Sequence, residues 1–185
     1  MARTPSTMSM SLGDSAPDFT LPDTVSGKNI SLADIRSEIA TVIMFICNHC
    51  PFVIHVQPEL VRLANEYIPK NIQFVAISSN DIVNYPQDSP EKMRKEAQKA
   101  GYRFPYLYDE SQEVAKRYDA ACTPDFYIFD KDLKCVYRGQ LDDSRPGNDQ
   151  ALTGRDIRNA LEAILNNQQV TSEQKPSIGC NIKWK

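Results

Sequence analysis

The sequence is short of the features that mark membrane proteins and nucleic-acid-binding proteins. Its 185 residues carry a formal net charge of -3, and no stretch is rich in lysine and arginine. No apolar run approaches the roughly 20 residues that a membrane-spanning helix requires. Proteins that bind nucleic acid usually present a basic stripe or patch. We therefore expect neither a membrane nor a nucleic acid among the partners of this protein.

The N-terminus also lacks an apolar segment. Residues 1–12 are small and polar, and they do not contain the apolar core of a secretory signal. We expect them to form a flexible arm outside the folded domain. Without a recognisable signal, the default prediction is a cytoplasmic location.

Cysteine occurs in an odd number, which argues against a framework of structural disulfides. The chain has five cysteines and is long enough to build a hydrophobic core, so it does not need disulfides for stability. Two of them, Cys47 and Cys50, are spaced Cys-x-x-Cys and are followed by Pro51. Thiols at this spacing reach each other across one tight turn, so they predict a dithiol that exchanges electrons.

Hydrophobic patterns predict strands that alternate with helices. Residues 41–46 and 72–77 are continuous apolar runs, as expected of strands buried on both faces of a sheet. The other expected elements are a hairpin over 19–32, helices over 56–67, 89–101, 109–118 and 157–165, and strands over 106–108, 126–129 and 135–137, with Thr153 as the cap of the last helix. This order predicts an α/β sandwich with a mixed central sheet and an N-terminal β-hairpin.

The dithiol lies where a strand meets a helix. Cys47 follows the strand over 41–46, and Cys50 precedes the next helix, at the end of the sheet where open α/β proteins place their sites. A helix N-terminus favours a thiolate, and His49 between the two sulfurs is predicted to favour it further as a cation. We assign Cys47 as the attacking thiol with a lowered pKa, and Cys50 as the thiol that resolves the mixed disulfide.

Two other interpretations of this pair stay open. Small cysteines are common in protein cores, so both thiols could be inert. His49 and His55 could instead join the two cysteines as zinc ligands. However, the sequence has no second Cys-x-x-Cys and no histidine pair at ligand spacing, so we predict no metal site and no cofactor.

Several motifs together resemble the thioredoxin fold, and within it the peroxiredoxin-like (AhpC/TSA) and thiol-disulfide oxidoreductase branch. They are the opening 13–19, the words CNHCPF at 47–52 and DSPE at 88–91, the step Thr123-Pro124 before a strand, and the ending SIGCNIKW at 177–184. The resemblance implies a thioredoxin-like three-layer sandwich over residues 13–170, with residues 171–185 as a C-terminal tail packed on it. It also implies that Pro124 is a cis proline opposite the dithiol, and that the backbone of Thr123 contacts an extended substrate.

The chain departs from the family patterns next to the dithiol. Aligned on Cys50, it has Cys47 where peroxiredoxins carry the threonine that orients the peroxide, and Ile43 where they carry a proline. Thioredoxins have a tryptophan at the position of Ile46. The resemblance therefore favours thiol-disulfide exchange, with thiol or disulfide proteins as substrates and a thiol as reductant. A thiol peroxidase with Cys50 as the peroxidatic residue is the alternative.

A third hypothesis is a redox-sensing binding module without catalysis, suggested by the long polar loop 78–89 and by the tail that ends near Trp184. Three residues are candidates for accessory roles. Cys122 is either a third redox partner or a packed thiol, Cys180 could fold back over the site or pair between chains, and Arg145 could attract an anionic substrate. The oligomeric state is open, with a homodimer as one alternative.

Overall fold

The computed structural model describes residues 3–185, and over these residues it shows ten β-strands and five α-helices. The strands are β1 (Thr4–Pro5), β2 (Thr20–Pro22), β3 (Asn29–Ser31), β4 (Ala40–Phe45), β5 (Ile72–Ser78), β6 (Tyr106–Tyr108), β7 (Cys122–Thr123), β8 (Asp125–Asp130), β9 (Cys135–Gly139) and β10 (Ile178–Asn181). The helices are α1 (Leu32–Ile35), α2 (Pro51–Tyr67), α3 (Pro90–Ala100), α4 (Glu113–Arg117) and α5 (Arg155–Leu165), and single 3₁₀ turns follow at Ile68–Lys70 and Pro86–Asp88.

The central sheet is mixed, as predicted. Its order is β6-β5-β4-β8-β9. β4 pairs in parallel with β5, and β5 with β6, whereas β8 runs antiparallel to both β4 and β9. Every residue of β4 is buried, because this strand lies at the centre of the sheet and is covered on both faces. The predicted hairpin is present as β2 and β3, which pair antiparallel.

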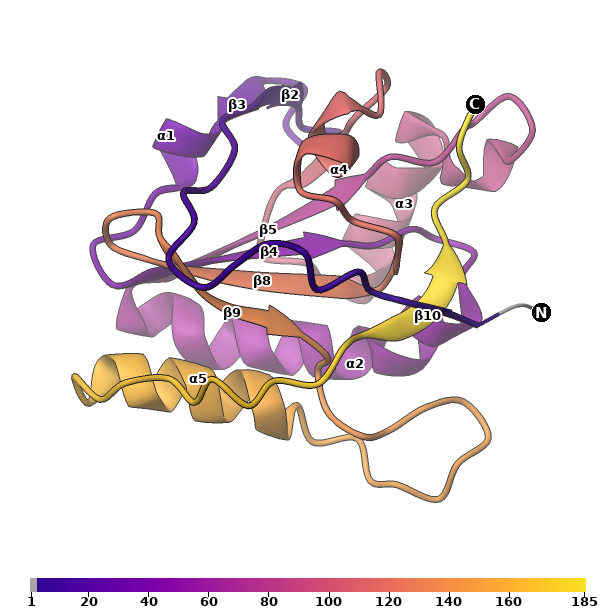
Figure 1. Ribbon diagram of the computed structural model, residues 1–185. Helices are drawn as coiled ribbons and strands as arrows, with labels where there is room; N and C mark the ends of the chain where they lie inside the picture. The colour runs from indigo at the N-terminus through magenta and orange to yellow at the C-terminus, as the bar shows by residue number, and fades with distance from the viewer. Residues whose placement is uncertain (1–2) are drawn as a thin grey trace.

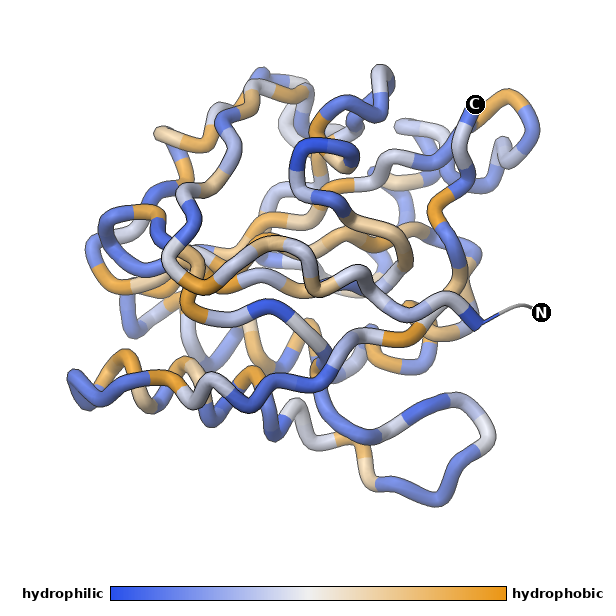
Figure 2. The backbone as a smooth tube through the Cα atoms, in the orientation of Figure 1, coloured by the Kyte–Doolittle hydropathy of each residue, from blue (hydrophilic) through white to orange (hydrophobic). Residues whose placement is uncertain are grey.

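Two apolar clusters separate the sheet from the layers on its faces. Side chains from α2, α3 and α5 pack on one face in one cluster, and the hairpin, α1 and α4 cover the other face in a second cluster. Figure 1 shows α2 and α5 below the sheet, with α1 and the hairpin above it. In Figure 2 the central strands are the most hydrophobic part of the chain, while the helices and loops contain both hydrophobic and hydrophilic residues. The fold is the predicted three-layer, thioredoxin-like sandwich.

Helix termini follow local sequence signals in some places and tertiary contacts in others. α3 begins after Ser89 and ends at Gly101, whose φ of 76° is the left-handed conformation that glycine adopts without cost, as predicted. The prediction that Thr153 caps the last helix is wrong, because Gly154 occupies that position. The carboxylate of Asp142 instead accepts hydrogen bonds from the backbone N–H groups of both residues, at 2.7 and 2.6 Å. A side chain from earlier in the same loop, between β9 and α5, therefore replaces the local cap.

A second, three-stranded sheet has the order β1-β10-β7 and was not predicted. The N-terminal segment does not extend away from the domain as an arm, because Thr4 and Pro5 pair with Gly179 and Ile178 of β10. Figure 1 shows this strand beside β10, at the end of the sheet from which α2 starts. Backbone hydrogen bonds hold this segment in the sheet. Its side chains show little apolar periodicity, so the sequence did not predict the strand. The predicted domain limits 13–170 and 171–185 stay predictions.

Candidate active site

The two cysteines lie in the turn between β4 and α2. Cys50 is the N-cap of α2, and Pro51 occupies the first turn, where its missing N–H costs nothing. All five cysteines are thiols. Both members of the pair are buried, with exposed fractions of 3% for Cys47 and 0% for Cys50. A reagent therefore reaches neither sulfur without passing a covering segment.

The sulfur of Cys50 accepts several hydrogen bonds. The thiols of Cys47 and Cys180 donate to it, and so does the backbone N–H of Val53 in the first turn of α2. In its protonated form, Cys50 donates to the carbonyl oxygen of Thr123, at 3.2 Å. Donors that converge on a sulfur at a helix N-terminus stabilise its thiolate form.

These donors favour the thiolate at Cys50 and the protonated thiol at Cys47. The hydrogen bond from Cys47, followed by those from Cys180 and other donors, lowers the pKa of Cys50 to about 5 against the opposing effect of burial. The pKa of Cys47 is raised well above its ordinary value by this same hydrogen bond, by burial and by the negative charge of Asp88. This direction at Cys47 is the opposite of the predicted lowering, because its thiol donates to Cys50, because it is buried and because the carboxylate of Asp88 lies nearby. Which of the two thiols attacks stays a proposal.

Asp88 holds the turn between the cysteines, and sequence reasoning missed this residue. Its side chain is fully buried. One carboxylate oxygen accepts the backbone N–H of Asn48 at 2.8 Å, and the other lies 2.6 Å from Nδ1 of His49 and accepts Nδ2 of Asn80 at 2.8 Å. The ring of His49 also stacks on Tyr85, with the two centroids 5.5 Å apart. Nδ1 of His49 is therefore directed to Asp88, and this contact helps to hold the turn that carries the two thiols.

Three atoms near the dithiol could serve as metal ligands. Within residues 3–185, the ligand atoms of Cys47, His49 and Asp88 lie within 4.8 Å of one another. Zinc normally takes four ligands in a tetrahedron, and both oxygens of Asp88 already accept hydrogen bonds. The ligand set considered from the sequence is not assembled, because Nε2 of His55 lies 2.8 Å from Oγ of Ser144 instead.

The segment around Thr123 lies directly over the dithiol. The Thr123-Pro124 peptide bond is cis, as the resemblance implied. Oγ1 of Thr123 lies 3.6 Å from the sulfur of Cys47. β10 pairs antiparallel with β7, and this register places Cys180 opposite Thr123. The backbone edge that was expected to contact an extended substrate is therefore occupied by the chain's own C-terminal segment.

Gly179 allows this close approach of β10 to β7. A Cβ atom at this position would overlap the carbonyl group of Thr123 and approach the nitrogen of Pro124. These are backbone atoms, so no change of rotamer relieves the overlap. Glycine is required here for packing, and the sequence signal for it was the short word Gly-Cys-Asn in the tail.

The three accessory candidates lie in different environments. Cys180 is 4% exposed, and burial, followed by its hydrogen bond to Cys50, raises its pKa to about 12. Cys122 is fully buried, and its thiol donates to the carbonyl oxygen of Pro124 at 3.7 Å; burial raises its pKa. Arg145 lies in a shallow hollow that Pro124 also lines, and its guanidinium donates to backbone carbonyls of its own loop. An anion-binding role for Arg145 stays a prediction.

A buried carboxyl group follows the cis proline. Asp125 is 1% exposed, and burial raises its pKa to about 8. The hydroxyl of Tyr127 donates to the carbonyl of Tyr118 at 3.1 Å and lies 3.2 Å from Oδ2 of Asp125. Since a tyrosine hydroxyl has one proton, a neutral Asp125 that donates to Tyr127 satisfies both contacts.

We expect Asp125→Asn to make the protein more stable at neutral and mildly alkaline pH. The unfolded chain loses this proton near pH 3.8, whereas the folded chain holds it up to about pH 8. The wild-type protein therefore loses stability relative to the variant as pH rises through this window, and the two behave alike below it. The gain is on the order of a few kcal/mol, because one unit of pKa shift corresponds to about 1.4 kcal/mol. Urea unfolding across the window measures it, with the exposed Asp149→Asn as control; an equal gain at all pH values would contradict the assignment.

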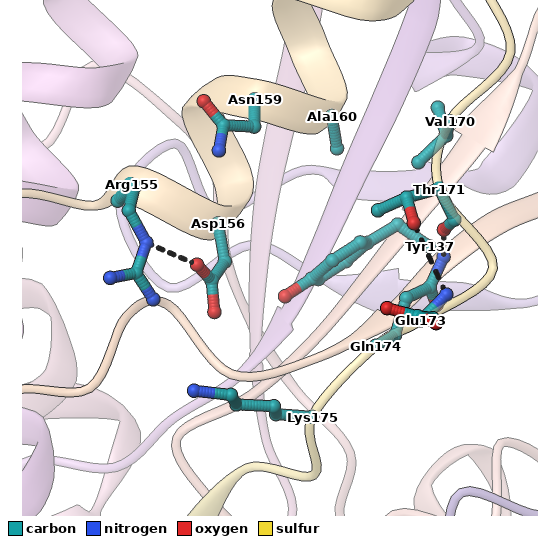
Figure 3. Close-up of a pocket in the computed structure, with 10 residues that line it drawn as sticks. All are labelled: Tyr137, Arg155, Asp156, Asn159, Ala160, Val170, Thr171, Glu173, Gln174 and Lys175. Atoms are coloured by element: carbon teal, nitrogen blue, oxygen red, sulfur yellow. Dashed lines mark hydrogen bonds and ion pairs between the residues drawn. The ribbon is translucent and has the colours of Figure 1, made fainter.

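A separate hollow of about 280 Å³ lies between β9, α5 and residues 170–175. Figure 3 shows Tyr137 and Ala160 along it, with the ion pair of Arg155 and Asp156 at one end. None of its lining residues is a cysteine. The hollow is therefore separate from the dithiol chemistry.

Several known proteins are similar to this chain in sequence or in fold. The model of the AhpC/TSA family matches residues 12–138. An uncharacterised conserved protein from Geobacillus kaustophilus, whose crystal structure is known, is 64% identical, with a TM-score of 0.98 over 100% of this chain and 97% of that one.

Two curated relatives carry functional names. A candidate peroxiredoxin from Mycobacterium tuberculosis is 32% identical over 58% of this chain, and the match spans 63% of that protein. The thiol-disulfide oxidoreductase ResA of Geobacillus kaustophilus is 26% identical over 84% of this chain and 79% of its own length. The relatives thus carry two different thiol chemistries in their names.

Among the described helices, none combines the length and the apolar character that a membrane crossing requires. This agrees with the lack of a long apolar run in the sequence.

Proposed function

The chain belongs to the AhpC/TSA family, and on that basis we propose that it is a thiol-disulfide oxidoreductase in which Cys50 is the nucleophile and Cys47 the resolving thiol. The observation that carries the proposal is the convergence of the Cys47, Cys180 and Val53 donors on the sulfur of Cys50. A thiolate, and not a thiol, attacks a disulfide. The roles of the two cysteines are therefore reversed relative to the sequence prediction.

The reaction needs only the two cysteines and an external disulfide. The Cys50 thiolate attacks one sulfur of the substrate, a new S–S bond forms, and the other substrate sulfur leaves as a thiolate. Cys47 then attacks the sulfur of Cys50, and its proton passes to the second leaving thiolate. The products are a Cys47–Cys50 disulfide, one substrate thiol and one substrate thiolate, which takes a proton from water, so two electrons have moved to the substrate.

The surroundings of Cys47 suit the second step. Its sulfur already contacts Cys50 through a hydrogen bond, so a small movement brings the two sulfurs to bonding distance. Its raised pKa keeps it protonated until Cys50 is consumed as a mixed disulfide. An oxidised protein returns to the dithiol when a thiol reductant reverses these steps.

A thiol peroxidase is the second candidate, and one observation favours it. The low-pKa thiol is Cys50, the residue that aligns with the peroxidatic cysteine of peroxiredoxins. Against it, Cys47 stands where those enzymes carry the threonine that orients the peroxide. The stabilising donors at Cys50 are the thiols of Cys47 and Cys180, the hydroxyl of Thr123 and a backbone N–H. Two of these four donors are thiols, which are weaker hydrogen-bond donors than the hydroxyl and N–H groups that orient a polar oxidant.

The binding-module hypothesis stays a proposal, as do the predicted partners and the predicted cellular location. The loop 78–89 that motivated a binding module has a structural role, because Asp88 within it holds the turn of the dithiol. We propose thiol or disulfide substrates and a thiol reductant as partners, in the cytoplasm. A homodimer stays an open alternative.

A stopped-flow comparison of two oxidants tests the proposal. We expect a small disulfide to oxidise the reduced protein rapidly to the Cys47–Cys50 disulfide, and hydrogen peroxide to react slower by on the order of 10²-fold or more, because Cys47 replaces the threonine that orients the peroxide in peroxiredoxins. Peptide mapping identifies the bond formed in each case. Faster oxidation by peroxide than by the disulfide would replace the proposal with the peroxidase.

A further inference from the structure

Three thiols, and not two, meet at the redox centre. Cys180 reaches it from β10, a segment about 130 residues further along the chain than Cys50. Its thiol donates a hydrogen bond to the sulfur of Cys50, on which the thiol of Cys47 also donates. Cys50 is therefore the common neighbour of two thiols, and either of them is placed to react with it.

The backbone of β10 fixes Cys180 in this position. The residue pairs with Thr123 in the antiparallel register of β10 and β7. On its N-terminal side, Gly179 brings the strand against the carbonyl group of Thr123. On its C-terminal side, Ile182 is buried in the second apolar cluster, and its N–H donates to the carbonyl of Ala121 at 3.1 Å. The thiol is held by contacts on both sides and is not placed there by chance packing.

We propose that Cys180 is a third redox-active thiol of this centre, which resolves Cys50 in competition with Cys47, and that β10 occupies the place of an extended substrate. The proposal rests on the proposed function in taking Cys50 as the nucleophile. Beyond the proposed function, it assigns a role to Cys180, which contacts the reacting sulfur, and to β10, the strand that carries this residue.

The chemistry balances without a further reactant. When Cys50 has formed a mixed disulfide with a small disulfide substrate, the sulfur of Cys180 attacks the sulfur of Cys50 and the substrate thiolate leaves with the proton of Cys180. The same attack on a Cys47–Cys50 disulfide moves the bond to Cys50–Cys180 and returns the proton to Cys47. Both routes end with one S–S bond and one remaining thiol among the three cysteines.

This arrangement also limits the substrate. The edge of Thr123 is paired with β10, and the exposed fractions of Cys47, Cys50 and Cys180 are all 4% or less. An extended peptide cannot pair with Thr123 while β10 is in place, because each strand edge accepts one partner. The closed form therefore takes small disulfides or other small oxidants.

Disulfide mapping of Cys47→Ser tests the proposal. The reduced variant is treated with diamide, a small two-electron oxidant that becomes the hydrazine, then quenched in acid, alkylated and digested. We expect most molecules to contain an intramolecular bond between the Cys50 and Cys180 peptides. The matched Cys47→Ser/Cys180→Ser variant should leave Cys50 without an intramolecular partner. A bond from Cys50 to Cys122, or only intermolecular bonds, would overturn the proposal.

Two further samples separate this proposal from the proposed function. Cys180→Ser retains Cys47 and Cys50, so failure of that variant to form their disulfide would reject the dithiol mechanism, whatever Cys180 does. If Cys47→Ser does not fold, the oxidised wild-type protein provides the test. Acid quenching of the oxidised wild type is expected to give Cys50–Cys180 peptides beside Cys47–Cys50 peptides, and their complete absence would overturn the role of Cys180.

Discussion

Cys50→Ser is expected to slow the reduction of a small disulfide by on the order of 10³-fold or more, because a serine hydroxyl is not ionised at neutral pH and cannot replace the thiolate. Cys47→Ser should behave differently. It retains the nucleophile, so the first substrate thiol is released and the reaction halts or diverts after the mixed disulfide. The two variants together separate attack from resolution.

A single-turnover assay that counts released thiols measures this difference. The control is Cys135→Ser, which removes a buried thiol of β9 from the second apolar cluster, on the face of the sheet away from α2. We expect it to release thiols at the wild-type rate. A fast first release in Cys50→Ser, with none in Cys47→Ser, would restore the assignment made from the sequence.

Gly179→Val is expected to open the covering sheet. The new Cβ overlaps the carbonyl group of Thr123, and because that group belongs to the backbone and cannot change rotamer, the strand has to move away. The pairing of Cys180 with Thr123 is then lost, and the dithiol loses its cover. We expect alkylation of Cys50 by iodoacetamide to accelerate by on the order of 10²-fold, because local opening no longer limits access.

Asn181→Val is the matched control for this variant. It introduces the same side chain on the same strand, at an exposed residue whose amide hydrogen-bonds to its chain neighbours Ile182 and Lys183. Its alkylation rate should stay close to that of the wild type. An unchanged rate in Gly179→Val, measured by mass spectrometry of the labelled peptides, would contradict the covering role of β10.

The central part of the fold could be predicted because its signals are local. The apolar run that forms β4 and the proline after Cys50 identify a strand, a turn and a helix within a short stretch of sequence. The spacing of the two cysteines indicated the candidate site for the same reason. The cis Thr123-Pro124 bond came from the resemblance and not from local propensity.

The remaining features depend on contacts between distant segments. β1, β7 and β10 have two to four residues each, too few to show an alternating pattern. The roles of the two sulfurs depend on Asp88 beside Cys47 and on Cys180 beside Cys50. The spacing within the Cys-x-x-Cys motif does not indicate that Asp88 or Cys180 lies beside it. The long polar loop 78–89 and the motif DSPE at 88–91 pointed to this region, but neither assigned a role to Asp88.

The ultraviolet absorbance of thiolates, titrated in the reduced wild type, Cys50→Ser and Cys47→Ser proteins, tests most directly that Cys50 is the ionised nucleophile. The predicted result is one thiolate in the wild type with a midpoint near pH 5, which disappears in Cys50→Ser and persists in Cys47→Ser with a higher midpoint, since the largest stabilising hydrogen bond comes from Cys47. A low-pH thiolate that persists in Cys50→Ser and disappears in Cys47→Ser would contradict the account.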